Sequence, residues 1–204
     1  MNVLPIKTFE TEPWIMGKHY AKRMPPISFA FGLYENELLV GICTYGMPAS
    51  PFLCMGVCGE ENKSNVIELN RLCIDTDRRN AASTLVGRSL QMLPKPSIVV
   101  SYADVAQHHV GYVYQACNFL FTGTSKERTD MAGDSGHHSR HNKGDRNNRI
   151  DRSSKHRYVF FVGDKKEKRR LRTDLRYEVL PYPKGDTQRY DAGQRVKTQP
   201  LLFL

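Results

Sequence analysis

The densest group of polar side chains lies in residues 101–118, which read SYADVAQHHVGYVYQACN. A carboxylate, imidazoles, phenols and a hydroxyl occur there together, and they can supply an acid, a base and hydrogen-bond donors. The residues concerned are Ser101, Tyr102, Asp104, His108, His109, Tyr112 and Tyr114. The first three follow an apolar run, and open α/β sheets bind ligands at the carboxyl ends of such strands. The alternative is a capped helix with buried tyrosines, but the variety of groups favours a functional site.

A second polar group lies near the N-terminus, where a His-Tyr pair stands among basic residues. It comprises Trp14, Lys18, His19, Tyr20, Lys22 and Arg23. Cations can bind phosphate, and an aromatic ring can stack on a nucleobase. An exposed basic loop would explain the same residues equally well. We expect this pair to meet the loop that follows residue 102 in a single polar cleft.

A third pair of charges interrupts the apolar segment 66–74 (VIELNRLCI). Alternation predicts a strand with Ile67, Leu69, Arg71 and Cys73 on one face. Glu68 and Arg71 are three residues apart, so on a regular strand they face opposite sides and do not pair. A charge within such a strand needs a partner or a ligand, and Arg71 suits a phosphate or carboxylate.

The elements that must position these groups alternate along the chain. The pattern predicts a hairpin at 27–33 and 37–45, strands at 66–74, 97–102, 118–123 and 156–163, and helices at 81–93, 108–117 and 164–176. Residues 51–60 are ambiguous and are read as a loop. Such alternation predicts an α/β fold with a mixed central sheet and flanking helices. The order is that of the acetyltransferase-like (GNAT) fold.

The apolar segments form a single catalytic domain from residues 1–123 and 156–183. Residues 124–155 are charged and rich in Gly, Ser and His, so we expect a disordered basic insertion there. Residues 184–204 form a polar stretch that we expect to be a flexible tail.

The overall composition limits the classes of partner and the cellular location that we expect for the protein. The 204 residues carry 30 Lys and Arg against 21 Asp and Glu, a net charge of +9 that favours a polyanionic partner. Five cysteines without paired zinc spacing argue against a disulfide framework and predict small buried side chains. No stretch of ~20 apolar residues and no secretory signal are present, so we expect a cytoplasmic protein.

Three separated motifs resemble the phage Mom-type DNA modification family. They are GKHYAKRMP, VIELNRLCI and IVVSYADVAQHHVGYVYQACNFLFTG, and the resemblance spans residues 14–183. It implies an acetyltransferase-like fold and an enzyme that converts the exocyclic amine of adenine in double-stranded DNA to a methylcarbamoyl-type adduct. Such an adduct masks phage DNA from host restriction. The resemblance also implies iron as a possible cofactor.

The resemblance assigns candidate site residues one by one. Residues that match the family's motifs are His19, Tyr20, Arg71, Ser101, Tyr102, Asp104, His109, Gly111, Tyr112 and Tyr114. It implies that Asp104 or His109 removes the amine proton, or that both join His19 in an iron site.

The remaining candidates would hold the two substrates. Aromatic rings for a flipped adenine are those of Tyr20, Tyr102 and Tyr112. Arg71 would orient the donor and Tyr114 would protonate the leaving group. Lys22 and Arg23 would bind DNA phosphates.

One segment departs from ordinary acetyltransferases. Their pyrophosphate-binding loop is rich in glycine, whereas residues 75–84 read DTDRRNAAST. Backbone amides at a helix N-terminus can still bind phosphate, so the donor is acetyl-CoA or another small molecule. Two other functions stay open, namely an acyl-CoA-dependent N-acetyltransferase of a small molecule or protein, and a DNA-binding protein without catalysis.

The end of the chain carries a separate motif. Gln199, Leu202 and Phe203 fit the pattern Q-x-x-L-F, which resembles peptides that dock on the replicative sliding clamp. The alternative is a tail that packs on its own domain.

Overall fold

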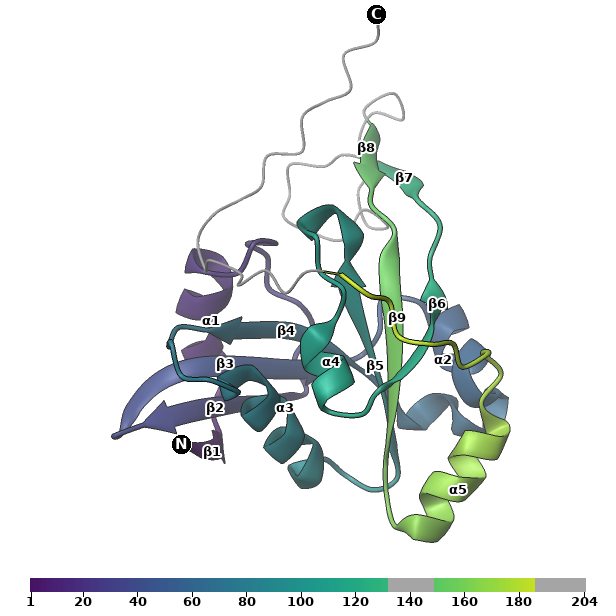
Figure 1. Ribbon diagram of the computed structural model, residues 1–204, viewed down its shortest axis with the longest axis horizontal. Coiled ribbons are helices and arrows are strands. Elements are labelled where there is room, and N and C mark those ends of the chain that lie inside the picture. Colours follow the sequence, from purple (N-terminus) through teal and green to yellow (C-terminus); the bar gives the residue numbers. More distant parts are fainter. Residues whose placement is uncertain (132–148, 186–204) are drawn as a thin grey trace, which may run out of the picture.

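The computed structural model describes residues 1–131 and 149–185, which form a mixed α/β structure around a seven-stranded sheet (Figure 1). The strand order is β1-β2-β3-β4-β5-β9-β6, and a separate two-stranded ribbon pairs β7 with β8. The strands of the sheet are β1 (Asn2–Pro5), β2 (Phe29–Glu35), β3 (Leu38–Gly46), β4 (Val66–Ile74), β5 (Ser97–Asp104), β6 (Leu120–Thr124) and β9 (Lys155–Val162). The ribbon strands are β7 (Arg128–Met131) and β8 (Arg149–Arg152). The predicted α/β class with a mixed central sheet is confirmed.

Helices cover both faces of this sheet. They are α1 (Thr8–Gly17), α2 (Pro51–Cys58), α3 (Ala81–Met92), α4 (Tyr112–Ala116) and α5 (Lys165–Asp174), with short 3-10 helices η1 (Glu60–Asn65) and η2 (Val105–Gln107). The α3 and α4 helices pack on the face that Figure 1 shows in front. The opposite face packs against α2 and α5 in one apolar cluster and against α1 in another.

The segments with the clearest apolar patterns form the helix and the strand that these patterns predicted. The α3 helix buries Leu85, Val86 and Leu90 on one side, as its spacing of apolar residues requires. The continuous apolar run in β5 is buried on both faces, because Ile98 and Val100 pack into one core and Val99 into the other.

A β-bulge in β4 overturns the predicted alternation of that strand. Thr44 on β3 pairs with Arg71 and Tyr45 with Leu69, so Asn70 is an extra residue without a partner. Before the bulge, Leu69 packs in the core under α3; after it, Cys73 packs in the cluster on the α1 face. The prediction that these side chains share one face is therefore wrong.

The sheet opens between β4 and β5. These two strands pair in parallel, and their register ends at Leu69 opposite Ser101. Beyond that pair β4 continues to Ile74 and β5 to Asp104 without pairing to each other. The ends of both strands are thus free to line a site.

Several elements were not expected from the sequence. The α1 helix contains Pro13 and has no regular apolar spacing, but Thr11 and Ile15 are fully buried. The α2 helix replaces the loop expected at 51–60. The insertion expected at 124–155 begins and ends in the β7–β8 ribbon, and residues 132–148 lie outside the described part of the chain.

Candidate active site

The two polar groups that lie far apart in the sequence meet in the structure. The ring of Tyr20 stands edge-on to that of His109, with 6.3 Å between the centroids. The His19 and Tyr20 rings stack at 4.5 Å. The prediction that the early His-Tyr pair meets the loop after β5 is confirmed. We call the residues gathered there the polar cluster, which comprises His19, Tyr20, Glu68, Arg71, Ser101, Asp104, His109, Tyr114 and Lys155.

His19 is buried and uncharged. It directly follows α1, and the backbone N–H of Ala21 donates to its Nδ1 at 3.0 Å. Burial, with Arg71 and His109 nearby, lowers its pKa from 6.5 to about 3. Because Nδ1 accepts, the proton of the neutral ring is on Nε2, and His19 can act there as a hydrogen-bond donor.

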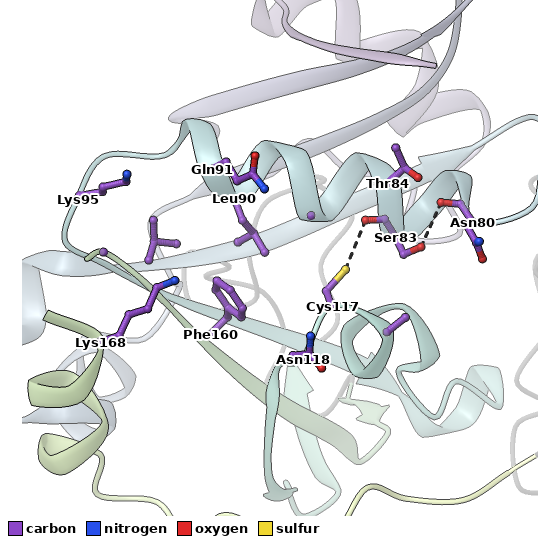
Figure 2. A pocket seen from close by; sticks show the side chains of 14 residues that line it. Asn80, Ser83, Thr84, Leu90, Gln91, Lys95, Cys117, Asn118, Phe160 and Lys168 are labelled. Atoms are coloured by element: carbon purple, nitrogen blue, oxygen red, sulfur yellow. Dashed lines mark hydrogen bonds between the residues drawn. The ribbon is translucent and has the colours of Figure 1, made fainter. Parts of the chain in front are cut away.

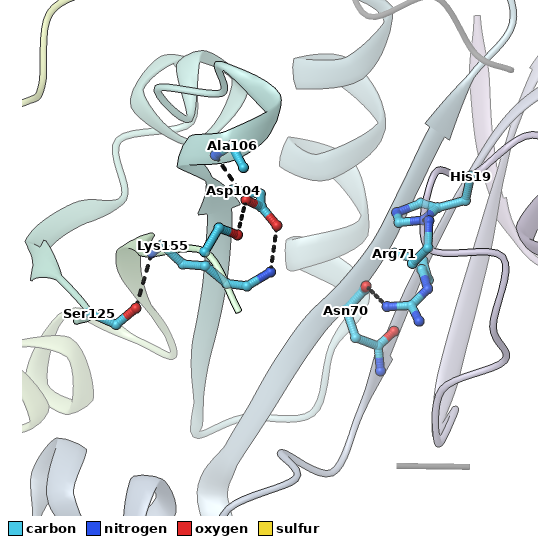
Figure 3. A network of polar contacts seen from close by, with 9 residues as sticks. His19, Asn70, Arg71, Asp104, Ala106, Ser125 and Lys155 are labelled. Carbon is cyan, nitrogen blue, oxygen red and sulfur yellow. Dashed lines mark hydrogen bonds and ion pairs between the residues drawn. The ribbon is translucent and has the colours of Figure 1, made fainter. Parts of the chain in front are cut away.

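Arg71 connects β4 to the loop that carries Tyr20. Its guanidinium donates to the carbonyl of Asn70 at 2.6 Å and to that of Arg23 at 2.7 Å. The bulge at Asn70 makes this direction possible, and Figure 3 shows Arg71 beside His19. Its Nε is buried and has no hydrogen-bond partner among the described residues.

Asp104 is held by a network at the end of β5 (Figure 3). Its Oδ2 accepts from the Lys155 ammonium at 2.8 Å. Its Oδ1 accepts from the Ser153 hydroxyl and from the backbone N–H of Ala106. Burial acts to raise the pKa of Asp104, but the hydrogen bonds outweigh it and hold the pKa below its ordinary value. Asp104 therefore stays ionised, and both of its oxygens are engaged in hydrogen bonds.

Glu68 lies at the centre of the cluster. Burial raises its pKa, although Arg71, Lys155 and Arg23 act in the opposite direction. Its charge in turn contributes to raising the pKa of three tyrosines, Tyr20, Tyr102 and Tyr114. The sequence had marked Glu68 as a charge within an apolar strand but had not placed it in the site. Glu68 and Arg71 are near enough for each to influence the pKa of the other, but no hydrogen bond or ion pair joins them among the described residues.

Tyr114 and Ser101 form the part of the cluster that faces α4. Tyr114 is a buried phenol whose pKa is raised by burial and lowered by a hydrogen bond with Ser101. The Ser101 hydroxyl also donates to the carbonyl of Leu69 at 2.9 Å, at the last pair before β4 and β5 separate. Tyr114 therefore remains protonated near the opening of the sheet.

Other predicted site residues lie outside this centre. Tyr102 packs with the α2 cluster on the face opposite to α3, although Glu68 remains within electrostatic reach. Tyr112 is 61% exposed and lines a cavity beside α3. Lys22 is exposed, whereas Arg23 is near enough to lower the pKa of Glu68. The proposed clamp-binding residues Gln199, Leu202 and Phe203 lie outside the described residues, so that motif stays a prediction.

The structure does not fit the predicted iron site. Within residues 1–131 and 149–185, no three His, Cys, Asp or Glu side chains are placed to hold a metal ion together. The Asp104 carboxylate faces the Lys155 cation, and His19 Nδ1 accepts from Ala21. The set of His19, Asp104 and His109 is thus engaged in other contacts.

Two cavities run along α3 and share Asn80, Ser83 and Ala116. One has a volume of about 860 Å³ and is lined by Arg78, Arg79 and Tyr112 around the start of α3. Figure 2 shows the other, of about 610 Å³, which extends to Lys95 and Lys168. The loop before α3 lacks glycine, and Asn80 takes the left-handed conformation at its end, with φ of 63°. Free amides at a helix N-terminus and flanking cations suit a phosphate group.

Comparison with known proteins gives a consistent result. The model of the Mom protein family matches residues 1–184. The methylcarbamoylase mom of Escherichia phage Mu is 30% identical over 191 residues, which cover 83% of this chain and 78% of that protein.

Two solved structures illustrate what the chain is similar to, and the first of them supports the fold. A probable acetyltransferase from Staphylococcus epidermidis has a TM-score of 0.50 and 11% identity, covering 79% of this chain and 98% of its own. An acetyltransferase of the GNAT family from Bacillus cereus has a TM-score of 0.47 and 13% identity, covering 80% and 98%. Among the described residues, no helix has the length and apolar character needed to cross a membrane.

Proposed function

The chain belongs to the Mom protein family, and from this premise we propose that it is a DNA-modifying transferase that adds a methylcarbamoyl-type group to the exocyclic amine of adenine. The adduct would protect phage DNA from host restriction. The observation that carries this proposal is the convergence of Glu68, Arg71, Tyr20 and His109 in one polar cluster. Binding to phosphate alone does not need a half-buried carboxylate with a raised pKa near two phenols.

Glu68 is the group best suited to take the proton from the adenine amine. That amine is a weak nucleophile, so its attack on an acyl carbon needs a base nearby. A base works best when its pKa lies near the working pH, and burial moves the pKa of Glu68 upward. Asp104 has its oxygens occupied and its pKa lowered. We therefore assign proton removal to Glu68 and positioning of Lys155 and the β5 loop to Asp104.

The His19–Tyr20 wall would hold the unstacked base. The Tyr20 ring offers a face for stacking, and its pKa, raised to about 12, keeps the phenol protonated. The Nε2–H of His19 would supply a donor to an acceptor atom of the base or of the transferred carbonyl. The positive charges of Lys22 and Arg23 lie on the same loop and would contact the DNA backbone.

The donor would enter from the α3 side of the sheet. The cavity at the start of α3 would take the phosphate of a donor near Arg78 and Arg79, and the reactive end of the donor would extend toward the point where β4 and β5 separate. A thioester of CoA type that already carries the methylcarbamoyl group would supply the activated carbonyl carbon, and its thiol would be the leaving group. Tyr114, next to the opening of the sheet, would give its proton to the leaving group while Ser101 orients the phenol.

Mass spectrometry of nucleosides tests the proposal. DNA from cells that express the chain should contain methylcarbamoyl-deoxyadenosine, and DNA from cells that express Asp104→Asn should contain far less. Acetylated deoxyadenosine would instead indicate an acetyl donor. Unmodified DNA in the presence of folded protein would contradict the proposed function.

A further inference from the structure

The connection between β3 and α2 presents two large apolar side chains to solvent. Phe52 is 79% exposed and Met47 is 65% exposed. The rest of this segment is not apolar surface, because Leu53 and Cys54 turn inward into the cluster with Tyr102. An exposed phenyl ring with no packing partner is unfavourable in water unless a bound partner covers it.

The backbone of this connection is restrained. Pro48 is buried, and Pro51 stands in the first turn of α2, where its fixed φ suits the helix. Val57 and Cys58 anchor the other end of α2 in the core. The segment can therefore present Phe52 without a large loss of chain entropy on binding.

The connection begins and ends beside the polar cluster. Gly46, the last residue of β3, pairs with Glu68, and Cys54 is near enough for the Glu68 charge to raise its pKa. Gly46 also lies against the carbonyl of Pro26, at the end of the loop that carries Lys22 and Arg23. Met47 directly follows Gly46, and Phe52 precedes Cys54 by two residues, so both belong to a segment whose two ends lie near Glu68.

We propose that Phe52 enters the base stack of double-stranded DNA when the target adenine leaves it. The inference rests on the proposed function. An enzyme that acts on an adenine amine must extract the base, which leaves a gap in the stack. Proteins that distort duplexes fill or open such gaps with apolar side chains, phenylalanine among them. The basic loop with Lys22 and Arg23 would hold the adjacent phosphates. Contact with another protein would not need these cations, so the loop favours DNA as the partner.

Phe52→Ala tests this role, with Phe9→Ala as a matched control. Phe9 is 67% exposed and lies at the end of α1 remote from His19. Each purified protein is given the same plasmid DNA, either native or heat-denatured, with a small-molecule extract of expressing cells as the donor source. Phe52→Ala should modify native DNA roughly tenfold or more slowly, and denatured DNA within about twofold of the unsubstituted protein. Phe9→Ala should match the unsubstituted protein on both.

The outcomes separate the wedge from other roles. An equal loss on both substrates, or no loss on native DNA, would overturn the wedge. A changed elution volume of Phe52→Ala in size-exclusion chromatography would overturn it in favour of contact with a second copy. Absence of modification by the unsubstituted protein would contradict the proposed function itself.

A duplex containing 2-aminopurine gives a second readout that needs no donor. Binding of the unsubstituted protein and of Phe9→Ala should raise the fluorescence of the unstacked analogue. Binding of Phe52→Ala should leave it low. A full rise with Phe52→Ala would also overturn the proposal.

Discussion

Two carboxylates on neighbouring strands have opposite environments. Asp104, at the end of β5, accepts hydrogen bonds from Lys155, Ser153 and the backbone of Ala106. Glu68, in the middle of β4, is half-buried, and desolvation raises its pKa although Arg71, Lys155 and Arg23 act to lower it. A carboxylate whose oxygens are hydrogen-bonded is a structural anchor, whereas one with a raised pKa is better suited to take a proton. We therefore expect Asp104 on β5 to hold neighbouring groups in place and Glu68 on β4 to take part in the reaction.

Substitution of Glu68 should have the largest effect on activity. Glu68→Gln keeps the shape but cannot accept the amine proton, so we expect modification of DNA to fall by ~10²–10⁴-fold. Nucleoside mass spectrometry measures the loss. The free energy of unfolding should change little, because the desolvation cost of the half-buried carboxylate opposes its attraction to Arg71, Lys155 and Arg23.

Glu60→Gln provides the control for this experiment, since Glu60 is exposed on η1. It should leave activity unchanged. If Glu68→Gln modifies DNA nearly as well as the unsubstituted protein, Glu68 is not the base. Asp104 or His109 would then be the candidate for proton removal.

Substitution of Asp104 should affect both activity and stability. Asp104→Asn leaves the Lys155 ammonium without its carboxylate, at a site where Lys155 is partly exposed, and should lower the free energy of unfolding by about 1–3 kcal/mol. Activity should fall as well, because His109 donates its backbone N–H to the carbonyl of Asp104 and would shift with it. Urea denaturation, run beside Glu68→Gln, measures the difference. Equal stability changes in both variants would contradict the contrast between the two carboxylates.

Substitution of Arg71 should reduce activity less than loss of the base. Arg71→Lys keeps the charge but loses the planar fork that reaches two carbonyls and leaves Nε free. We expect a decrease of roughly 10–100-fold in the rate of DNA modification. Arg88→Lys is the control, because Arg88 also donates to a backbone carbonyl but lies far along α3 and bonds to Met1. A similar small effect of both substitutions would show that Arg71 acts by charge alone.

The sequence predicted those parts of the molecule whose patterns are local. Strands with continuous or alternating apolar residues, such as β5 and β9, and the amphipathic α3 lie close to their predicted ranges. The α1 helix was missed because Pro13 and irregular spacing conceal it, and its burial depends on contacts with β2, β3 and β4. Tertiary packing here overrides local preference.

The site residues, too, could be predicted only where a local motif marks them. Motifs identified His19, Tyr20, Asp104 and His109, and the structure brings them together. The bulge at Asn70 has no signal in the sequence, yet it decides where Arg71 points and that Glu68 is its neighbour. Alternation without the bulge separated the two charges. The partner of Asp104 was also hidden, because Lys155 lies 51 residues away and is brought near only by the pairing of β5 with β9.

The last prediction, with the smallest expected effect, concerns the pH dependence of stability that the buried His19 should cause. The pKa of His19 is about 3 in the folded protein, below its ordinary value of 6.5. The unfolded chain therefore binds a proton below pH 6.5 that the folded protein does not bind until about pH 3, and stability falls as the pH falls through this window. Between pH 6.5 and pH 5 the loss should be about 2 kcal/mol. His19→Gln retains an acceptor for the Ala21 N–H but does not titrate, so its stability should change less over the same range by about that amount. Parallel pH profiles of the two proteins in urea denaturation would show instead that the His19 ring reaches solvent, and the neutral donor proposed beside Arg71 would be lost.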